Sequence, residues 1–425
     1  MNNQRLELVA DFYEYTMANG YFNKNMQDRI AYFDVFFRKV PDEGGYAIVA
    51  GLEQIINYIR NLSFDEEDIN YLRKQNKFSE EFLNYLENFR FTGDIWAIPE
   101  GTVVFPNEPL ITVKAPIIQA QLLETMLLLT TNHQSLIATK TSRIVKEAQG
   151  RPVMEFGARR AHGINAAVEG ARAAIIGGAV GTSCTLSAKE FNVPASGTMA
   201  HSWIQSFDSE YEAFKAYAEL YPDDCTFLID TYNTIESGLP NAIKVFNEVL
   251  KPKGYRPKAV RLDSGDLAYL SKKVRKILDE TGYKDCKICA TNSLDEYLIK
   301  SLIEQDAKID LFGVGENLIT AKSEPVFGGV YKLVALEKDK KIVPKIKVSE
   351  NTAKVTNPSV KKVYRFYDNE TKKAIADVIT LADEIIDERE YMIFDPQNPW
   401  KKKVLKDYSI RLLQEKIFEE RKINI

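Results

Sequence analysis

The chain has 425 residues, a formal net charge of −4, 45% hydrophobic residues and 27% charged residues. This length predicts more than one domain, and the near-balanced charge provides no broad basic surface for nucleic acid. No apolar run approaches the roughly 20 residues that a membrane-spanning helix needs, and the first residues lack the apolar core of a secretion signal. We therefore expect a cytoplasmic protein with reduced cysteines and with neither nucleic acid nor membrane as a partner.

The first part of the chain, residues 1–135, mixes helical and extended patterns. Residues 30–52 read as strand, turn and strand, with the turn at a Pro/Gly-containing stretch. Residues 64–89 have helical spacing. Four of their apolar residues fall on faces expected to be buried: Leu72, Phe82, Leu83 and Leu86. The pattern predicts an N-terminal α+β domain.

From about residue 150 the pattern changes to short apolar runs separated by helical segments. The runs are 153–156, 225–229, 259–262, 287–290 and 309–312. The last four are separated by helical segments at intervals that fit βαβ units, and small, polar or charged residues follow every run. Because the carboxyl ends of parallel strands share one edge, these loops are expected to form one site. The sequence predicts an α/β barrel or partial barrel over residues 136–335.

The remaining residues, 336–425, begin strand-like, continue through a Lys-rich stretch and end in a region for which we expect a helix. One CxxC motif, Cys286 to Cys289, precedes this segment. On a strand these two side chains point to opposite faces, and no second CxxC completes a zinc site. We therefore expect no metal site here.

Three of the strand-end loops contain side chains that suit anionic ligands. Gly313 and Gly315 end one strand before a helix, which fits either a phosphate-binding loop or an ordinary tight turn. Arg261 and Asp263 share one strand face, so they form either an internal ion pair or a site for a carboxylate or phosphate beside ribose or magnesium. Arg159 and its neighbour Arg160 follow Phe156, and this suggests a polyanion that carries a ring, although Phe156 alone is also compatible with a core position.

His201 is one of only three histidines. It lies in the stretch SGTMAHSW, after a Gly/Thr turn. A histidine at this edge fits a structural role, a general base or an acceptor of a phosphoryl group, and spacing alone does not choose between them.

Seven stretches together resemble the nicotinate phosphoribosyltransferase family. They occur in the family's order: ADFYEYTM, MEFGARR, GTMAHSW, VRLDSGDL, TNSLDE, FGVGENLIT and FGGVYKLV. The resemblance implies an irregular α/β barrel of the type II phosphoribosyltransferase kind, with an N-terminal domain completed by the C-terminal segment. It also implies that nicotinate and phosphoribosyl pyrophosphate (PRPP) give nicotinate mononucleotide and pyrophosphate, with Mg²⁺, coupled ATP hydrolysis and a homodimer with shared active sites.

The same resemblance implies roles for individual residues. His201 matches the histidine that ATP phosphorylates. The residues that match substrate contacts are Tyr13 from the other subunit and Phe156 on the pyridine ring, Arg261 and Thr198 on its carboxylate, Arg159 near the phosphates or ring, and Asp263 near the ribose. The residues that match the phosphate loop are Gly313, Gly315 and Thr320, with Gly328 and Gly329 closing it.

One departure bears on the choice of substrate. Nicotinamide-using relatives carry an aspartate where this chain has Gly181, Thr182 and Ser183. Hydroxyl groups suit an anionic carboxylate better than an aspartate does, and this favours nicotinate. The alternatives are a nicotinamide- or quinolinate-using transferase, or a non-catalytic phosphosugar-binding relative.

Overall fold

The structure is a computed structural model that describes residues 6–348, 350, 355–387, 389–396 and 398–419 and the backbone of 422–423. The chain divides into two compact units, one of residues 1–135 with 326–425 and one of residues 136–325. The boundary expected at residue 335 therefore lies at 325, because the strand that begins at Gly329 belongs to the first unit's sheet.

Unit 1 contains most of the strands of the chain. Its helices are α1 (Phe12–Asn23), α2 (Leu52–Asn61), α3 (Glu66–Lys74), α4 (Glu80–Glu87) and α5 (Ile117–Gln121), and α6 (Glu124–Glu147) crosses the boundary at 135. Its strands are β1 (Ile30–Phe37), β2 (Ala47–Ile48), β3 (Asp94–Ala97), β4 (Val103–Val104), β5 (Ile111–Pro116), β12 (Gly329–Lys338), β13 (Lys341–Pro344), β14 (Lys361–Asp368), β15 (Ala374–Leu381), β16 (Glu390–Asp395), β17 (Asn398–Lys406), β18 (Tyr408–Leu412), β19 (Glu415–Glu419) and β20 (Lys422–Ile423).

The main sheet of unit 1 is antiparallel and seven-stranded, in the order β13-β12-β1-β5-β3-β19-β20. Strand β1, which lies between β12 and β5, is buried along almost its whole length, and this agrees with its nearly unbroken apolar run. Asp34 interrupts that run, and its buried charge is balanced by Lys361 Nζ at 2.9 Å and by a hydrogen bond from Thr112 at 2.8 Å. The sheet therefore joins residues from both ends of the chain. The four apolar residues expected to be buried in α3 and α4 are indeed buried.

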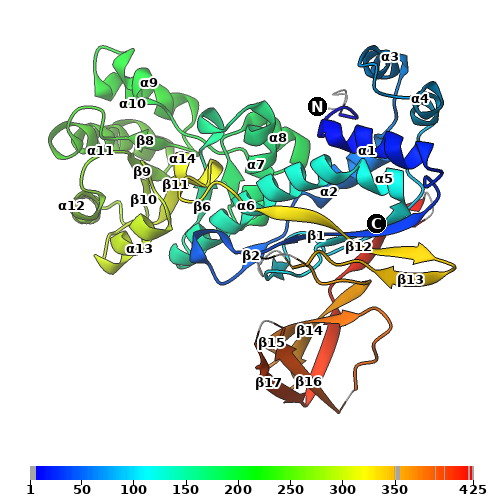
Figure 1. Cartoon of the computed structure of the whole chain (residues 1–425). Helices are drawn as coiled ribbons and strands as arrows, with labels where there is room; N and C mark the ends of the chain where they lie inside the picture. Colours follow the sequence, from blue (N-terminus) through cyan, green and yellow to red (C-terminus); the bar gives the residue numbers. More distant parts are fainter. Residues whose placement is uncertain are drawn as a thin grey trace. The chain divides into compact units, whose positions relative to one another are not determined.

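The C-terminal segment is built of strands. β15, β14 and β18 form a three-stranded sheet, and the β16–β17 hairpin contributes Leu405 to a small core with Phe366 and Tyr408. β19 pairs with β3 and thereby extends the N-terminal sheet (Figure 1). The helix expected near the end is wrong: these residues lie in strands β18 and β19, because pairing of β18 with β14 and of β19 with β3 overrides the local helical pattern.

A buried charged group ties the C-terminal sheet to the N-terminal strands. Arg365 pairs with Asp377 at 2.6 Å and donates to the carbonyl of Val103 at 2.6 Å. Glu108 lies beside this pair and accepts from the backbone N–H of Phe105 at 2.9 Å. Burial and the neighbouring Asp377 carboxylate raise the pKa of Glu108 to about 8, so this side chain is mainly neutral at pH 7.

Unit 2 alternates strands and helices. Its strands are β6 (Val153–Glu155), β7 (Gly181–Thr182), β8 (Thr226–Leu228), β9 (Ala259–Leu262), β10 (Lys287–Ala290) and β11 (Leu311–Val314). Its helices are α7 (Ile164–Ile176), α8 (Thr185–Phe191), α9 (His201–Gln205), α10 (Glu210–Leu220), α11 (Leu239–Val245), α12 (Leu267–Glu280), α13 (Glu296–Glu304) and α14 (Glu316–Ile319). Short turns of 3₁₀ or π helix in unit 2 cover Ala158–Arg160, Thr234–Gly238, Phe246–Leu250 and Lys251–Lys253. Another such turn, Pro41–Glu43, lies in unit 1.

The six strands of unit 2 form one sheet in the order β7-β6-β11-β10-β9-β8, and every pair in it is parallel. The sheet is curled into a partial barrel, and helices α11, α12 and α13 lie outside it (Figure 1). The expected α/β fold with a partial barrel is confirmed. Within the described residues, none of the helices is both long enough and apolar enough to cross a membrane.

Candidate functional site

The carboxyl edge of the unit 2 sheet gathers the predicted loops. Phe156 follows β6, Thr231 follows β8, Asp263 follows β9, Thr291 follows β10 and Gly315 follows β11. Since all these strands are parallel, their following loops leave the sheet on the same side. Residues that are far apart in sequence therefore meet at this edge.

Arg261 is the centre of the polar contacts at this edge. Its Nε donates to Thr291 Oγ1 at 3.0 Å, one terminal nitrogen donates to Thr198 Oγ1 at 2.8 Å and to the carbonyl of Met199 at 3.3 Å, and the other pairs with Asp263 at 3.1 Å. The Arg261 side chain is only 14% exposed. The internal ion pair is therefore present, and it fixes a cation at the edge of the site.

Asp263 is held ionised by its surroundings. Burial opposes its ionisation, but hydrogen bonds from Thr291 and Arg261, and the Arg261 charge, keep the pKa of the Asp263 carboxyl below its ordinary value. The backbone N–H of Asp263 donates to Asp230 Oδ2 at 2.9 Å, and Ser264 donates to the same oxygen at 2.5 Å. Asp263 thus contacts the Arg261 guanidinium, and the Asp230 carboxylate contacts the loop that begins at Asp263.

His201 begins helix α9 next to this network. Its Nδ1 lies 3.1 Å from Thr231 Oγ1, and its Nε2 lies 3.7 Å from Asp263 Oδ2. The side chain is 39% exposed, so the imidazole is accessible from solvent while one ring nitrogen contacts the protein. This arrangement suits an imidazole that exchanges a proton or a phosphoryl group.

Phe156 lies against β11, and Gly313 makes room for it. A Cβ atom on Gly313 would come within 2.6 Å of the Phe156 ring and 2.8 Å of the Thr291 methyl group. Gly313 is therefore needed for side-chain packing, and the phosphate contact predicted for it stays a prediction. Gly315 lies after the strand, where an added Cβ would come within 3.2 Å of the Phe156 carbonyl.

The two hydroxyl residues predicted to favour nicotinate differ in exposure. Thr182 is fully buried and donates to the buried Glu155 carboxylate at 2.6 Å. Burial raises the pKa of Glu155, while hydrogen bonds from Thr182 and the Gly157 N–H oppose this shift. Thr182 thus supports Glu155, and Ser183 is exposed beside it, while the substrate contacts predicted for these two residues stay predictions.

The other predicted residues of unit 2 surround α14. Arg159 and Arg160 are exposed after β6, and Arg160 lies 3.7 Å from a carboxylate oxygen of Glu316. The hydroxyl of Thr320 donates to the Glu316 carbonyl at 2.8 Å. The Thr320 hydroxyl oxygen can therefore still accept a hydrogen bond from a ligand, but its proton is already used.

Tyr13, Gly328 and Gly329 belong to unit 1. Tyr13 is on α1 and is 44% exposed. Gly328 has a φ of 73°, a conformation that favours glycine, and the Gly329 N–H donates to Asn132 Oδ1 at 2.7 Å. The Gly329 N–H is therefore bonded within the protein, and the phosphate-loop role predicted for Gly328 and Gly329 stays a prediction.

Sequence reasoning missed three polar residues of the site: Asp230, Thr231 and Thr291. The signal was present, because the stretches DTYNT and TNSLD directly follow strands β8 and β10. A short polar residue immediately after a parallel strand lies at the shared edge.

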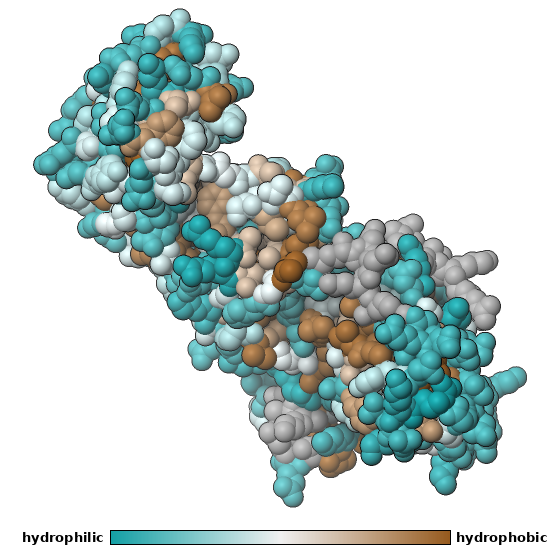
Figure 2. Space-filling model, turned by 90° about the horizontal axis from the view of Figure 1, so that it is seen from above, coloured by the Kyte–Doolittle hydropathy of each residue, from teal (hydrophilic) through white to brown (hydrophobic). Residues whose placement is uncertain are grey.

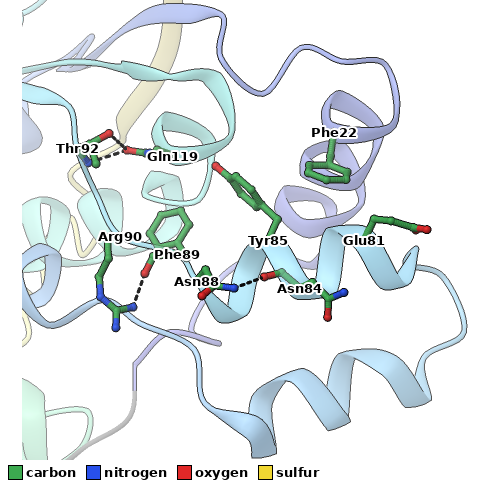
Figure 3. Close-up of a pocket in the computed structure, with 9 residues that line it drawn as sticks. All are labelled: Phe22, Glu81, Asn84, Tyr85, Asn88, Phe89, Arg90, Thr92 and Gln119. Atoms are coloured by element: carbon green, nitrogen blue, oxygen red, sulfur yellow. Dashed lines mark hydrogen bonds between the residues drawn. The ribbon is translucent and has the colours of Figure 1, made fainter.

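A separate cavity of about 500 Å³ lies in unit 1, between α1, α4 and the loop before β3. Its walls include Phe22, Tyr85 and Asn88, and Gln119 accepts hydrogen bonds from Thr92 at its edge (Figure 3). None of the predicted site residues lines it. The chemistry therefore points to the sheet edge of unit 2 and not to this cavity.

Cys286 and Cys289 are both buried, and burial raises the pKa of each thiol. In the described parts of the chain no three His, Cys, Asp or Glu side chains are grouped as metal ligands.

The molecular surface in Figure 2 is mainly hydrophilic and carries several hydrophobic patches.

Family models and known proteins match this chain along most of its length. The family model described as the nicotinate phosphoribosyltransferase (NAPRTase) family matches residues 152–380, and models of this enzyme's N-terminal and C-terminal domains match residues 8–132 and 360–424. The nicotinate phosphoribosyltransferase of Bacillus subtilis (strain 168) is 46% identical over 98% of this chain and 84% of its own length. The chain belongs to the nicotinate phosphoribosyltransferase family.

Other nicotinate phosphoribosyltransferases extend this similarity. The Caenorhabditis elegans protein is 36% identical over 89% of this chain and 76% of its own length. The crystal structure of human nicotinic acid phosphoribosyltransferase has a TM-score of 0.85 at 26% identity and covers 97% of this chain and 89% of its own. A nicotinate-nucleotide pyrophosphorylase from Pyrococcus furiosus has the same fold, with a TM-score of 0.75 at 24% identity over 99% of this chain and 90% of its own.

Proposed function

We propose that this protein condenses nicotinate with PRPP and that ATP hydrolysis drives the condensation through a phosphohistidine. The pyridine nitrogen forms a bond to C1 of the ribose while the bond from C1 to pyrophosphate breaks, so the products are nicotinate mononucleotide and pyrophosphate. The observation that carries the proposal is the Arg261 guanidinium, held by Thr198 and Asp263 beside His201. A fixed guanidinium is a good partner for a pyridine carboxylate.

His201 is the proposed phosphoryl acceptor. Its nitrogen would attack the terminal phosphorus of ATP with ADP as leaving group, and water would later cleave the P–N bond. The contact of Nδ1 with Thr231 supports Nε2 as the reacting nitrogen. The ionised Asp263 beside the ring would stabilise the positive charge that the imidazole gains as the P–N bond forms.

Magnesium would accompany ATP and PRPP and neutralise their phosphate charge. The donors present fit a cation held mainly by substrate phosphates, because Asp230 and Asp263 supply carboxylate oxygens at the same edge. Phe156 would lie against the pyridine ring, and Arg159 would approach the phosphates.

We also propose a cytoplasmic homodimer in which Tyr13 enters the site of the partner subunit. Phe12, Tyr13 and Met17 on α1 are each between 38% and 44% exposed, and burying such side chains against a second copy would remove apolar surface from water. The four cysteines are free thiols, as is usual in a reducing compartment.

The deciding assay is pyrophosphate release from PRPP and Mg²⁺ with nicotinate, nicotinamide or quinolinate, each with and without ATP. We expect nicotinate alone to support release and ATP to increase it. Release with nicotinamide or quinolinate instead would contradict the substrate assignment, and no release with any acceptor would leave only a binding protein.

His201→Ala should abolish ATP hydrolysis and ATP stimulation while a slow ATP-independent transfer remains. His162→Ala is the matched control, because His162 is an exposed histidine in the loop before α7. An unchanged ATP-stimulated rate in His201→Ala would show that His201 has a structural role.

A further inference from the structure

A buried lysine outside the site joins two of its loops. Lys140 on α6 has a side chain that is only 2% exposed. Its Nζ lies 2.7 Å from Glu296 Oε1 and 2.7 Å from Ser323 Oγ. Glu296 begins α13, which follows the loop after β10, and Ser323 follows α14, which comes directly after β11. One ammonium group therefore contacts both loop regions.

The two loop regions contain backbone conformations that need support. Asn292 and Ser293, after β10, have φ values of 87° and 50°, and Ala321, after α14, has a φ of 43°. Non-glycine residues adopt this left-handed region at a cost of about 1 kcal/mol or more each, and they persist where neighbouring groups hold them. The Asn317 amide of α14 supplies one such link, since it donates to the Ser293 carbonyl at 2.8 Å.

Lys140 balances the Glu296 carboxylate through a buried ion pair. One Glu296 carboxylate oxygen is bonded to Lys140, and the other is buried with no hydrogen-bond partner in the described structure. A buried carboxylate with so few donors depends on the one cation beside it. Loss of Lys140 would therefore disturb the start of α13 and release Ser323 at the same time.

We infer that Lys140 is a positioning residue for PRPP: it holds the loops after β10 and β11 in the arrangement that receives the phosphate groups. This inference rests on the proposed function, which places the phosphates at these loops. Lys140 touches no reacting atom in this scheme, so its removal should weaken PRPP binding selectively.

The test compares Lys140→Met, the double variant Lys140→Met/Glu296→Met and the control Lys287→Met. Lys287 is a 60% exposed lysine whose ion pair with Asp310 lies at the opposite end of β10. We expect Lys140→Met to raise KM for PRPP about tenfold, with KM for nicotinate within about twofold of wild type, since misplaced binding groups lose affinity for their own ligand. The control should match wild type.

The double variant separates positioning from stability. Replacing a buried ion pair by apolar side chains is often neutral for stability, so its thermal midpoint should recover towards wild type. Its KM for PRPP should stay raised, because neither methionine can donate a hydrogen bond to Ser323 Oγ as the Lys140 ammonium does.

A wild-type KM for PRPP in either Lys140 variant overturns the inference, as does a parallel loss for both substrates that recovers with stability in the double variant. Calorimetric titration of wild-type protein with PRPP and Mg²⁺ distinguishes the two failures. A wild type that neither binds PRPP nor turns over refutes the proposed function and this inference together.

Discussion

Gly313→Ala tests whether Gly313 makes room for Phe156, which would lie against the pyridine ring, or contacts the phosphates. The added Cβ would lie 2.6 Å from the Phe156 ring, while ordinary contacts begin near 3.4 Å, so the ring must retreat by about 0.8 Å. The φ of Gly313 is not positive, so the backbone itself tolerates alanine. Overpacking of this size costs about 1–3 kcal/mol of stability.

The kinetic consequence follows from the displaced ring. Aromatic stacking contributes about 0.5–1.5 kcal/mol beyond buried area, so its loss should raise KM for nicotinate roughly 2- to 10-fold. KM for PRPP should change little. Gly197→Ala is the control, because nothing lies within 4 Å of the Cβ position at Gly197.

A double-mutant cycle with Phe156→Ala checks the cause. Once the ring is absent, most of the stability cost of Gly313→Ala should disappear, because the 2.6 Å contact no longer exists. Urea unfolding of the four proteins measures this coupling. The reasoning is refuted if Gly313→Ala costs the same in both backgrounds, or if KM rises for PRPP and not for nicotinate.

Three further predictions concern other parts of the molecule. Because the pKa of Glu108 rises from an ordinary 4.5 to about 8 in the fold, its contribution to stability should fall as pH rises from about 4.5 to 8, and Glu108→Gln should make this slope shallower in urea unfolding at several pH values while the raised pKa of Glu14 maintains part of it. Thr231→Val should lower ATP-stimulated turnover about tenfold while Thr231→Ser stays near wild type, because only a hydroxyl can orient His201; equal rates in both variants would contradict this. Mixed dimers of a Tyr13 variant and an Arg261 variant should recover part of the activity, and no recovery in stable dimers would count against shared sites.

The barrel strands were predictable because a parallel sheet buries short continuous apolar runs. β9 and β10 begin and end where the sequence placed them, at 259–262 and 287–290. β7 was missed, because its two residues Gly181 and Thr182 are too short to show any periodicity. The end of the chain was predicted wrongly because its strands depend on distant partners: β18 pairs with β14, and β19 pairs with β3 about three hundred residues away.

The sequence predicts which residues lie at the same edge of the sheet, but not which side chains contact one another there. Consecutive parallel strands bring Thr198, Arg261 and Asp263 to one edge, and the sequence indicates that edge. It does not show that Thr182 bonds to Glu155 or that Gly313 accommodates a ring, because both depend on side-chain packing between neighbouring strands. At this site the role of a residue therefore depends more on which neighbour it contacts than on its residue type.

The ion-pair and ligand-binding interpretations of Arg261 are compatible once its donors are counted. A guanidinium has five N–H groups, and four of the contacts at this edge use them: one to Thr291, one to Thr198, one to the Met199 carbonyl and one to Asp263. Such a group has little freedom left to lose when an acid binds, and its charge is already fixed in position. The internal contacts are thus the means by which Arg261 would recognise a carboxylate, since the three N–H groups of a flexible lysine could not serve these four partners and a substrate together.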